Sequence, residues 1–307
     1  MDYRYFLAVV DSGSLASAGE RLHIAPSAVS RQIALLEEQV GIQLFDRRPR
    51  GMHLTAGGEA LAAHARRARL EEEKLLLELR GNDYPGAKMI RVASTEGLSR
   101  NFLPQVMVAF EKLHPSVQYR LDVTTPSACV DKVRTGEVDI GITFSTAPLQ
   151  AVNIEYSCRS TTCALMRTHH PLAREAVLSL TEMQPYPVAL TAEGTTQRQL
   201  FDLACQLEGL TFRHSMVCNY SSALQEFVRQ SDAIALASKV GRIGNPEDGL
   251  VSIPLSNSQL SERHIQILTM QKRKLPHVLE RFVASLIERL DQTAEILHPE
   301  HPSHRNG

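Results

Sequence analysis

One helix-forming segment of this 307-residue chain, residues 26–40, carries a face whose residue types suit contact with DNA. Its apolar residues recur at helical spacing and predict a buried stripe, which consists of Val29, Ile33, Leu36 and Val40. The other face carries Glu38 and the expected DNA contacts, which are Ser27, Ser30, Arg31 and Ala34. Short side chains permit close approach to base edges, and an arginine pairs with guanine or with phosphate. We therefore expect this helix to enter the major groove.

A shorter helix that begins after Ser14 is expected to hold the helix at 26–40, which we call the reading helix, in place. Ser14 is a favoured N-cap residue, and residues 22–25 turn the chain. Pro26 has the fixed φ angle that is favoured in a first helical turn. Two helices joined in this way form a helix-turn-helix unit, which places its second helix in a DNA groove.

A basic hairpin follows at 46–55, where two short strands are expected around a tip with Pro49 and Gly51. Its arginines are expected to lie beside the sugar-phosphate backbone, and they are Arg47, Arg48 and Arg50. Phosphate contacts supply affinity and salt dependence but little sequence preference. The alternative for each arginine is a solvated charged turn.

Residues 5–61 resemble the winged helix-turn-helix of LysR-type transcriptional regulators. The matching residues occur in order and without gaps, and they are Phe6, Gly13–Ser14, Leu22, Ala28–Ile33, Leu36–Glu37, Gly41, Leu44–Phe45, Arg47 and Leu54–Gly58. Gly19, Ala25 and Pro26 depart from the family's usual alanine, cap serine or threonine, and groove-facing glutamine. The departure at Pro26 weakens the transfer of base contacts. The alternative is a similar helix pair inside another globular protein, which would lack the wing.

A long helix is expected over residues 57–80. Its apolar face consists of Leu61, Ala65, Ala68, Leu75, Leu76 and Leu79. Such a helix is marginal in isolation, so this face needs a partner surface. The LysR resemblance implies the same helix of a second subunit, and the alternative is packing on the helix's own domain. Turn-forming residues at 81–86 then predict a hinge.

From residue 88 onward, short apolar strands alternate with amphipathic helices, which indicates α/β organisation. Strands are expected at 90–94, 117–125, 138–143, 163–166, 186–190, 215–219, 233–236 and 265–270, and helices at 98–114, 127–135, 196–207, 222–230 and 276–290. This layout is similar to the two-lobed, periplasmic-binding-protein-like effector domain of LysR-type regulators, with a cleft between the lobes. The predicted fold is an N-terminal all-α winged helix-turn-helix domain plus linker helix, followed by this C-terminal α/β domain.

The expected domain boundaries follow from these elements. They are a DNA-binding domain at 1–57, a dimerisation helix at 58–80, a hinge at 81–87 and an effector-binding domain at 88–307. Within the last, lobe I is expected at about 88–160 and 265–292, and lobe II at about 161–264. Residues 293–307 are expected to form a disordered tail.

Hydroxyl-bearing residues gather where the expected strands end and helices begin. Ligands of open α/β sheets bind at such places, and helix N-termini attract anions. The expected effector-binding residues are Ser94, Thr95, Thr125, Ser127, Thr143, Phe144, Thr195, Asn219 and Tyr220, with Thr124, Thr196, Ser221 and Ser238 at similar positions. The alternative for each is an ordinary helix cap. We expect a small carboxylate or amino acid, selected by Glu96 or Arg198 if either points inward.

The composition bounds the function. The formal net charge is −1, so attraction to nucleic acid must come from local arginine clusters. The chain shows no signal-peptide pattern and no apolar stretch near the roughly 20 residues that span a bilayer. We therefore expect a cytoplasmic protein with no membrane partner.

Catalysis is not indicated by the residue pattern. The sequence contains no nucleophile–base set, phosphate-binding glycine loop or paired zinc motif, so we expect no enzymatic activity, no cofactor and no metal site. The five cysteines are odd in number and lack metal-ligand spacing. We expect them to be reduced and packed, and the alternative is a redox pair of Cys205 and Cys218.

Together with the resemblance, these features predict a LysR-type, sequence-specific transcriptional regulator that a small-molecule effector modulates. The expected partners are double-stranded promoter DNA, the effector, RNA polymerase, and further copies of the chain in a homodimer or homotetramer. The resemblance implies that two reading helices bind an interrupted inverted repeat. One alternative is a solute-binding module whose N-terminal helices only oligomerise. Another, a nonspecific chromosome-architectural protein, would require a strongly basic chain.

Overall fold

The computed structural model describes residues 3–48, 51–80, 89–242 and 249–297. The chain divides into two compact units near residue 85, and each is described by itself. Within the described ranges, no helix is long and apolar enough to cross a membrane.

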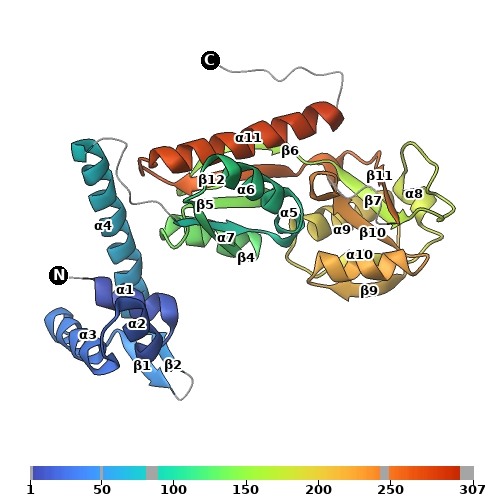
Figure 1. The fold of residues 1–307 in the computed structure, drawn as a ribbon. Helices are drawn as coiled ribbons and strands as arrows, with labels where there is room; N and C mark the ends of the chain where they lie inside the picture. The colour runs from blue at the N-terminus through green and yellow to red at the C-terminus, as the bar shows by residue number, and fades with distance from the viewer. Residues whose placement is uncertain (1–2, 49–50, 81–88, 243–248, 298–307) are drawn as a thin grey trace. The chain divides into compact units, whose positions relative to one another are not determined.

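The N-terminal unit consists of packed helices and one two-stranded hairpin (Figure 1). Its elements are α1 (Arg4–Ser12), α2 (Leu15–Leu22), α3 (Pro26–Val40), β1 (Phe45–Arg48), β2 (Gly51–Leu54) and α4 (Ala56–Arg80). The strands pair antiparallel, with Phe45 opposite Leu54. The predicted helix-turn-helix, wing hairpin and long helix are therefore confirmed. The expected hinge at 81–86 lies outside the described residues.

The turn between α2 and α3 is fixed by local chemistry. The Ser14 hydroxyl accepts the N–H of Ser17 at 3.1 Å and caps α2 as predicted. His23 ends this helix in the left-handed region with φ 56°, and Pro26 occupies the first turn of α3. A Cβ added to Gly19 would lie 2.7 Å from the carbonyl oxygen of Ile24. Alanine, which is usual at this place in the resembling family, would therefore require the Ile24 carbonyl to shift in this chain.

The wing is joined to α3 by a buried core and by one carboxylate. Phe6, Val29, Ile33 and Leu44 are at most 1% exposed and pack in one cluster. Oε1 of Glu37 accepts the N–H of Leu44 at 2.8 Å and that of Phe45 at 3.2 Å. The hairpin therefore keeps a fixed position relative to the reading helix.

The C-terminal unit contains two five-stranded sheets, each of which forms a lobe (Figure 1). The sheet of lobe I has the order β4-β3-β5-β12-β6. Its strands are β3 (Met89–Ser94), β4 (Gln118–Val123), β5 (Ile140–Ser145), β6 (Val152–Arg159) and β12 (His264–Met270), and its helices are α5 (Glu96–Ser99), α6 (Phe102–Leu113), α7 (Pro126–Arg134) and α11 (His277–Leu297). The helices α6 and α11 cover one face of this sheet and α7 covers the other.

The sheet of lobe II has the order β11-β7-β10-β8-β9. Its strands are β7 (Thr162–Arg167), β8 (Val188–Thr191), β9 (His214–Cys218), β10 (Ile234–Ser238) and β11 (Leu250–Pro254), and its helices are α8 (Leu180–Met183), α9 (Thr196–Glu208), α10 (Ser221–Arg229) and the short 3₁₀ segments η1 (Val240–Arg242) and η2 (Gln259–Ser261). The core under α9 and the core under α10 lie on opposite faces of this sheet. The chain leaves lobe I after β6 and returns in β12, which confirms the predicted two-lobed α/β fold.

A buried ion network fixes one end of lobe I. The Asp139 carboxylate accepts hydrogen bonds from Arg91 at 2.9 and 3.0 Å and from Arg273 at 2.8 Å. Burial by itself would raise the pKa of Asp139, but the hydrogen bonds from Arg91 and the charges of Arg91 and Arg273 outweigh it, so the pKa is lowered. This network clamps the segment that leads into β5.

Several predicted elements need correction. The single helix expected at 98–114 is divided into α5 and α6 because Asn101 leaves the helical conformation and donates its side-chain N–H to the carbonyl oxygen of Gly241 at 3.0 Å. The strands β6 and β11 and the helix α8 were not predicted. Residues 293–297, expected in a disordered tail, belong to α11 because Thr293 is buried against the lobe, whereas 298–307 lie outside the described residues.

Candidate DNA-reading surface and ligand cleft

The predicted reading face of α3 is open to solvent. Val29, Ile33 and Leu36 are buried, whereas Val40 is only half-buried. On the other side Ser27, Arg31, Ala34 and Glu38 are exposed and Ser30 is half-buried on the flank. The first two turns therefore present short side chains beside one guanidinium, an arrangement that suits contact with base edges.

The wing hairpin carries the predicted phosphate contacts beside this helix. Arg47 and Arg48 lie at the end of β1, next to the tip. Their side chains, and Arg50 as a whole, lie outside the described residues. Their contact with phosphate therefore stays a prediction from the sequence.

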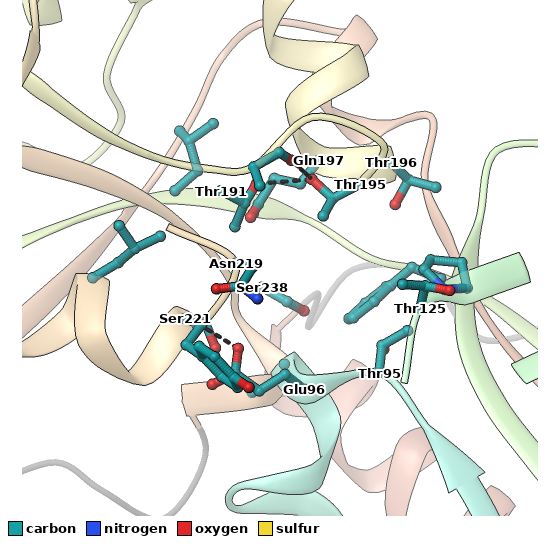
Figure 2. Close-up of a pocket in the computed structure, with 18 of the residues that line it drawn as sticks. Thr95, Glu96, Thr125, Thr191, Thr195, Thr196, Gln197, Asn219, Ser221 and Ser238 are labelled. Carbon is teal, nitrogen blue, oxygen red and sulfur yellow. Dashed lines mark hydrogen bonds between the residues drawn. The ribbon is translucent and has the colours of Figure 1, made fainter. Parts of the chain in front are cut away.

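The C-terminal unit contains a cavity of about 520 Å³ between its two lobes (Figure 2). The predicted residues that line it are Thr95, Thr125, Ser127, Phe144, Thr195, Asn219 and Tyr220. Thr124, Thr196, Ser221 and Ser238 line it as well. Figure 2 shows Thr95 and Thr125 across the cavity from Thr191, Thr195 and Gln197. Both lobes thus present hydroxyl and amide groups to one space of ordinary ligand-site volume.

Ser94 and Thr143 were predicted to line the cleft, and the structure contradicts this. Both are 0% exposed and absent from the cavity wall. The Ser94 hydroxyl donates to the carbonyl oxygen of Thr95 at 3.2 Å, and the Thr143 hydroxyl to that of Phe144 at 3.4 Å. Neighbouring side chains of a strand point to opposite faces, so only the second member of each pair reaches the cavity.

Three further lining residues were not predicted as site residues. Thr191 ends β8, and its hydroxyl lies 2.8 Å from that of Thr195. Gln197 stands in the first turn of α9, and Arg263 directly precedes β12. The signal used for the other residues, a polar group at a strand end, could have found Thr191. Arg263 carried no such signal because it precedes the strand expected at 265–270 and does not follow a strand end.

Glu96 lines the cavity and contacts the opposite lobe (Figure 2). Its carboxylate accepts the backbone N–H of Ser221, and at 3.2 Å that of Ser222, at the N-terminus of α10. It also accepts the hydroxyl of Ser222 at 3.0 Å. A carboxylate is favoured at a helix N-terminus, where N–H groups lack helical partners. Glu96 therefore caps a helix of lobe II from lobe I and holds this edge of the cleft together.

Replacing Glu96 by alanine is expected to loosen the contact between the lobes. Loss of a cap costs about 0.5–2 kcal/mol, and here the loss falls on a contact across the cleft. We expect faster hydrogen exchange of the first amides of α10, which mass spectrometry of peptides around Ser221 measures. Glu182→Ala is the matched control, because Glu182 completes a capping box with Ser179 inside lobe II. Equal exchange at α10 in wild type and Glu96→Ala would show that Glu96 does not stabilise this helix from lobe I.

Arg198 cannot select a ligand as the sequence suggested. Its Nε donates to both carboxylate oxygens of Asp202, at 2.8 and 2.7 Å, and the residue does not line the cavity. A pairing four residues along one helix explains this orientation. Glu96 does reach the cavity wall, but its carboxylate is engaged by α10.

The cysteines are free thiols in the structure. Burial raises the pKa of Cys129 to about 12 and the pKa values of Cys158, Cys163 and Cys205 to about 11. Thiolate is the reactive form, and a raised pKa suppresses it at neutral pH. This chemistry argues against the alternative of a redox pair that includes Cys205.

Two family models together cover most of the chain. The model described as "LysR substrate binding domain" matches residues 85–291, and that described as "Bacterial regulatory helix-turn-helix protein, lysR family" matches residues 1–59. A RuBisCO operon transcriptional regulator of Allochromatium vinosum is 29% identical over 238 residues, which are 76% of this chain and 78% of that protein. The regulator CysB of Haemophilus influenzae is 24% identical, over 83% and 79% of the two chains.

Solved structures share the fold over nearly the full length. A full-length variant of OxyR from Pseudomonas aeruginosa superposes with a TM-score of 0.77 at 17% identity, covering 92% of each chain. Full-length CbnR in complex with its target DNA gives a TM-score of 0.61 at 19% identity, covering 94% of this chain and 100% of CbnR. With a reading helix and wing in one unit and an effector-binding domain in the other, the chain belongs to the LysR family of DNA-binding transcriptional regulators.

Proposed function

We propose that this LysR-type regulator reads promoter DNA with α3, places its wing arginines on phosphates, and responds to a small carboxylate or amino acid in the cleft. The observation that carries the DNA-reading part is the exposed face of α3, where Ser27, Arg31 and Ala34 stand opposite a stripe of buried side chains. The relatives reported above are named as regulators, which supports a role without catalysis.

We propose that two subunits pair through α4. Leu75 and Leu79 lie on the predicted apolar face of this helix and are 53% and 73% exposed in the single chain. A helix with an uncovered leucine face gains stability by burying it against a second one. The pairing would set two reading helices on an interrupted inverted repeat.

We propose a further contact between effector domains that makes a homotetramer. Exposed apolar side chains support it on two helices of the C-terminal unit, with Val108 and Leu113 on α6 and Leu203 and Leu207 on α9. Apolar residues gathered on a surface mark interaction sites. Sedimentation of the full chain reports the assembly directly.

The position of the cavity between the lobes supports a ligand response. A ligand that contacts both lobes stabilises whichever lobe arrangement brings those contacts together. Through the assembly this would change the spacing of the reading helices, the DNA bend and the access of RNA polymerase to the promoter. The ligand must bind the two arrangements with different affinity, because otherwise no equilibrium shifts.

The DNA-reading role is tested by comparing two arginines. Arg31→Ala is expected to weaken binding to a selected operator by about 1–3 kcal/mol and to affect random DNA much less, because a base contact is lost. Arg48→Ala should weaken binding to both DNAs similarly and flatten the salt dependence, because a phosphate contact is lost. Fluorescence anisotropy at several stated salt concentrations measures both. Equal losses on both DNAs for Arg31→Ala would reassign Arg31 to phosphate contact.

A further inference from the structure

Arg263 lies in the cavity wall, where the chain returns from lobe II to lobe I. It lies between η2 and β12 and forms part of the cavity wall. Its carbonyl oxygen accepts the N–H of Ser160 at 2.7 Å, and Ser160 belongs to the segment that leaves lobe I. The two crossing segments are thus joined at this residue, which fixes its position relative to both lobes.

The Arg263 guanidinium is buried, and no carboxylate among the residues that the structure describes forms an ion pair with it. The residue is 3% exposed, and its Nε and Nη2 have no hydrogen-bond partner in the part of the chain that the structure describes. Its Cζ lies 4.0 Å from the centroid of the Phe144 ring, a cation–π contact that orients the group. Burial lowers the pKa of Arg263 to about 10, so the side chain is still a cation at neutral pH. A buried cation is costly unless an anion pairs with it.

Two other residues of the cavity wall carry buried donors. Thr95 Oγ1 in lobe I and Gln197 Nε2 in lobe II are buried and have no partner among the described residues. A hydroxyl, an amide N–H₂ and a guanidinium share one property, since each can donate to a carboxylate oxygen. Leu165 and Leu236 add apolar surface to the wall. The cavity wall therefore combines a cation and neutral donors with apolar surface.

We propose that Arg263 binds the carboxylate of the effector, with Thr95 and Gln197 donating from the two lobes. The inference rests on the proposed ligand response and adds the residue and the charge that select the ligand. The expected ligand is a small organic acid whose carboxylate forms paired hydrogen bonds with the guanidinium. Because Arg263 lies on the crossing segment, its ion pair links ligand binding to the position of both lobes.

The free protein gives a first test through its stability. Arg263→Met removes an uncompensated buried cation while retaining an unbranched apolar stem, so the melting temperature of the unliganded full chain is expected to rise. Arg273→Met is the matched control, because the Arg273 side chain is also buried but pairs with Asp139 at 2.8 Å. Its melting temperature is expected to fall. A fall for Arg263→Met of similar size would give Arg263 a structural role and overturn the proposal.

Ligand binding gives the second test. Butyrate, phenylacetate and succinate are titrated into the full chain against their primary amides, with thermal shift followed by calorimetry. At least one acid is expected to raise the melting temperature while its amide does not. Arg263→Met and Thr95→Val should each weaken that acid, Arg263→Met by roughly tenfold or more, and Arg273→Met should leave its affinity unchanged. Arg263→Lys retains the charge but cannot form the paired hydrogen bonds of a guanidinium, so it should bind that acid more weakly than wild type.

The outcomes separate this inference from the proposed ligand response. Amides that bind as well as the acids, wild-type affinity in Arg263→Met, or stabilisation by none of the acids would each overturn the role of Arg263. If an amide binds and changes operator affinity, the cleft still senses a ligand and only its charge was inferred wrongly. If neither acids nor amides bind, the ligand response loses its support as well.

Discussion

A full chain with Leu75→Glu and Leu79→Glu is expected to be monomeric and to lose operator binding. Both leucines are exposed in the single chain and lie on the face that we propose to pair between subunits. A carboxylate buried there without a partner costs several kcal/mol for each subunit. Because two weakly bound half-sites need a linked pair of reading helices, dimerisation and operator affinity should fail together. Analytical ultracentrifugation and anisotropy measure the two effects on one sample.

Val177→Glu is the control for this pair of substitutions. Val177 is 50% exposed and precedes α8 in the C-terminal unit, so it lies far in the sequence from the leucine face of α4. It should leave sedimentation and DNA affinity unchanged. An intact dimer in the double leucine variant would place the subunit contact on another surface.

Asp139→Asn is expected to destabilise lobe I by about 3–5 kcal/mol, the usual cost of breaking a buried ion pair from one side. The substitution keeps the shape of the side chain but leaves Arg91 and Arg273 without their carboxylate. Urea unfolding of the full chain, followed by a probe of the C-terminal unit, measures the change. Asp202→Asn is the control, since Asp202 is a half-exposed partner of Arg198 and should change the free energy of unfolding by about 0–1 kcal/mol.

The same residue predicts a dependence on acid. The folded-state pKa of Asp139 is lowered. Its contribution to stability is therefore fully present above the pKa of the unfolded state, about 3.9, and is lost as the pH falls through the pKa of the folded state. Wild type should therefore lose more stability than Asp139→Asn when the pH is lowered below about 4. Parallel acid profiles for the two proteins would contradict the ion-network account.

Much of the fold could be predicted because its signals are local. Ser14 caps α2 through its own hydroxyl, and the periodic residues of α3 mark their buried side directly. The elements that were missed depend on tertiary contacts. The edge strand β6 has two exposed residues in succession, Ile154 and Glu155, and a register shift against β12, so its side chains do not alternate regularly. The break between α5 and α6 is set by a bond from Asn101 to a residue far away in the sequence.

In the candidate site too, the residues with local signals could be predicted and those that depend on tertiary contacts could not. Hydroxyl residues at strand ends, such as Thr95 and Thr195, could be named because parallel strands bring their carboxyl ends to one edge. The face of the sheet to which each side chain points was harder to predict, so Ser94 and Thr143 were expected in the cavity wall although they are buried away from it. Glu96 and Arg263 depend on contacts between distant parts of the chain. No spacing in the sequence indicates that Glu96 caps α10, or that Nε and Nη2 of Arg263 lack a hydrogen-bond partner among the described residues.

Selection of bound fragments from a pool of random duplex DNA tests the central claim most directly. The full chain is incubated with the pool at a stated salt concentration, and bound sequences are amplified over several rounds. The account predicts an interrupted inverted repeat whose half-sites are spaced by about one helical turn or a multiple of it, with a changed half-site preference in Arg31→Ala. A pool without any enriched sequence, or an identical motif from wild type and Arg31→Ala, would contradict DNA reading by α3.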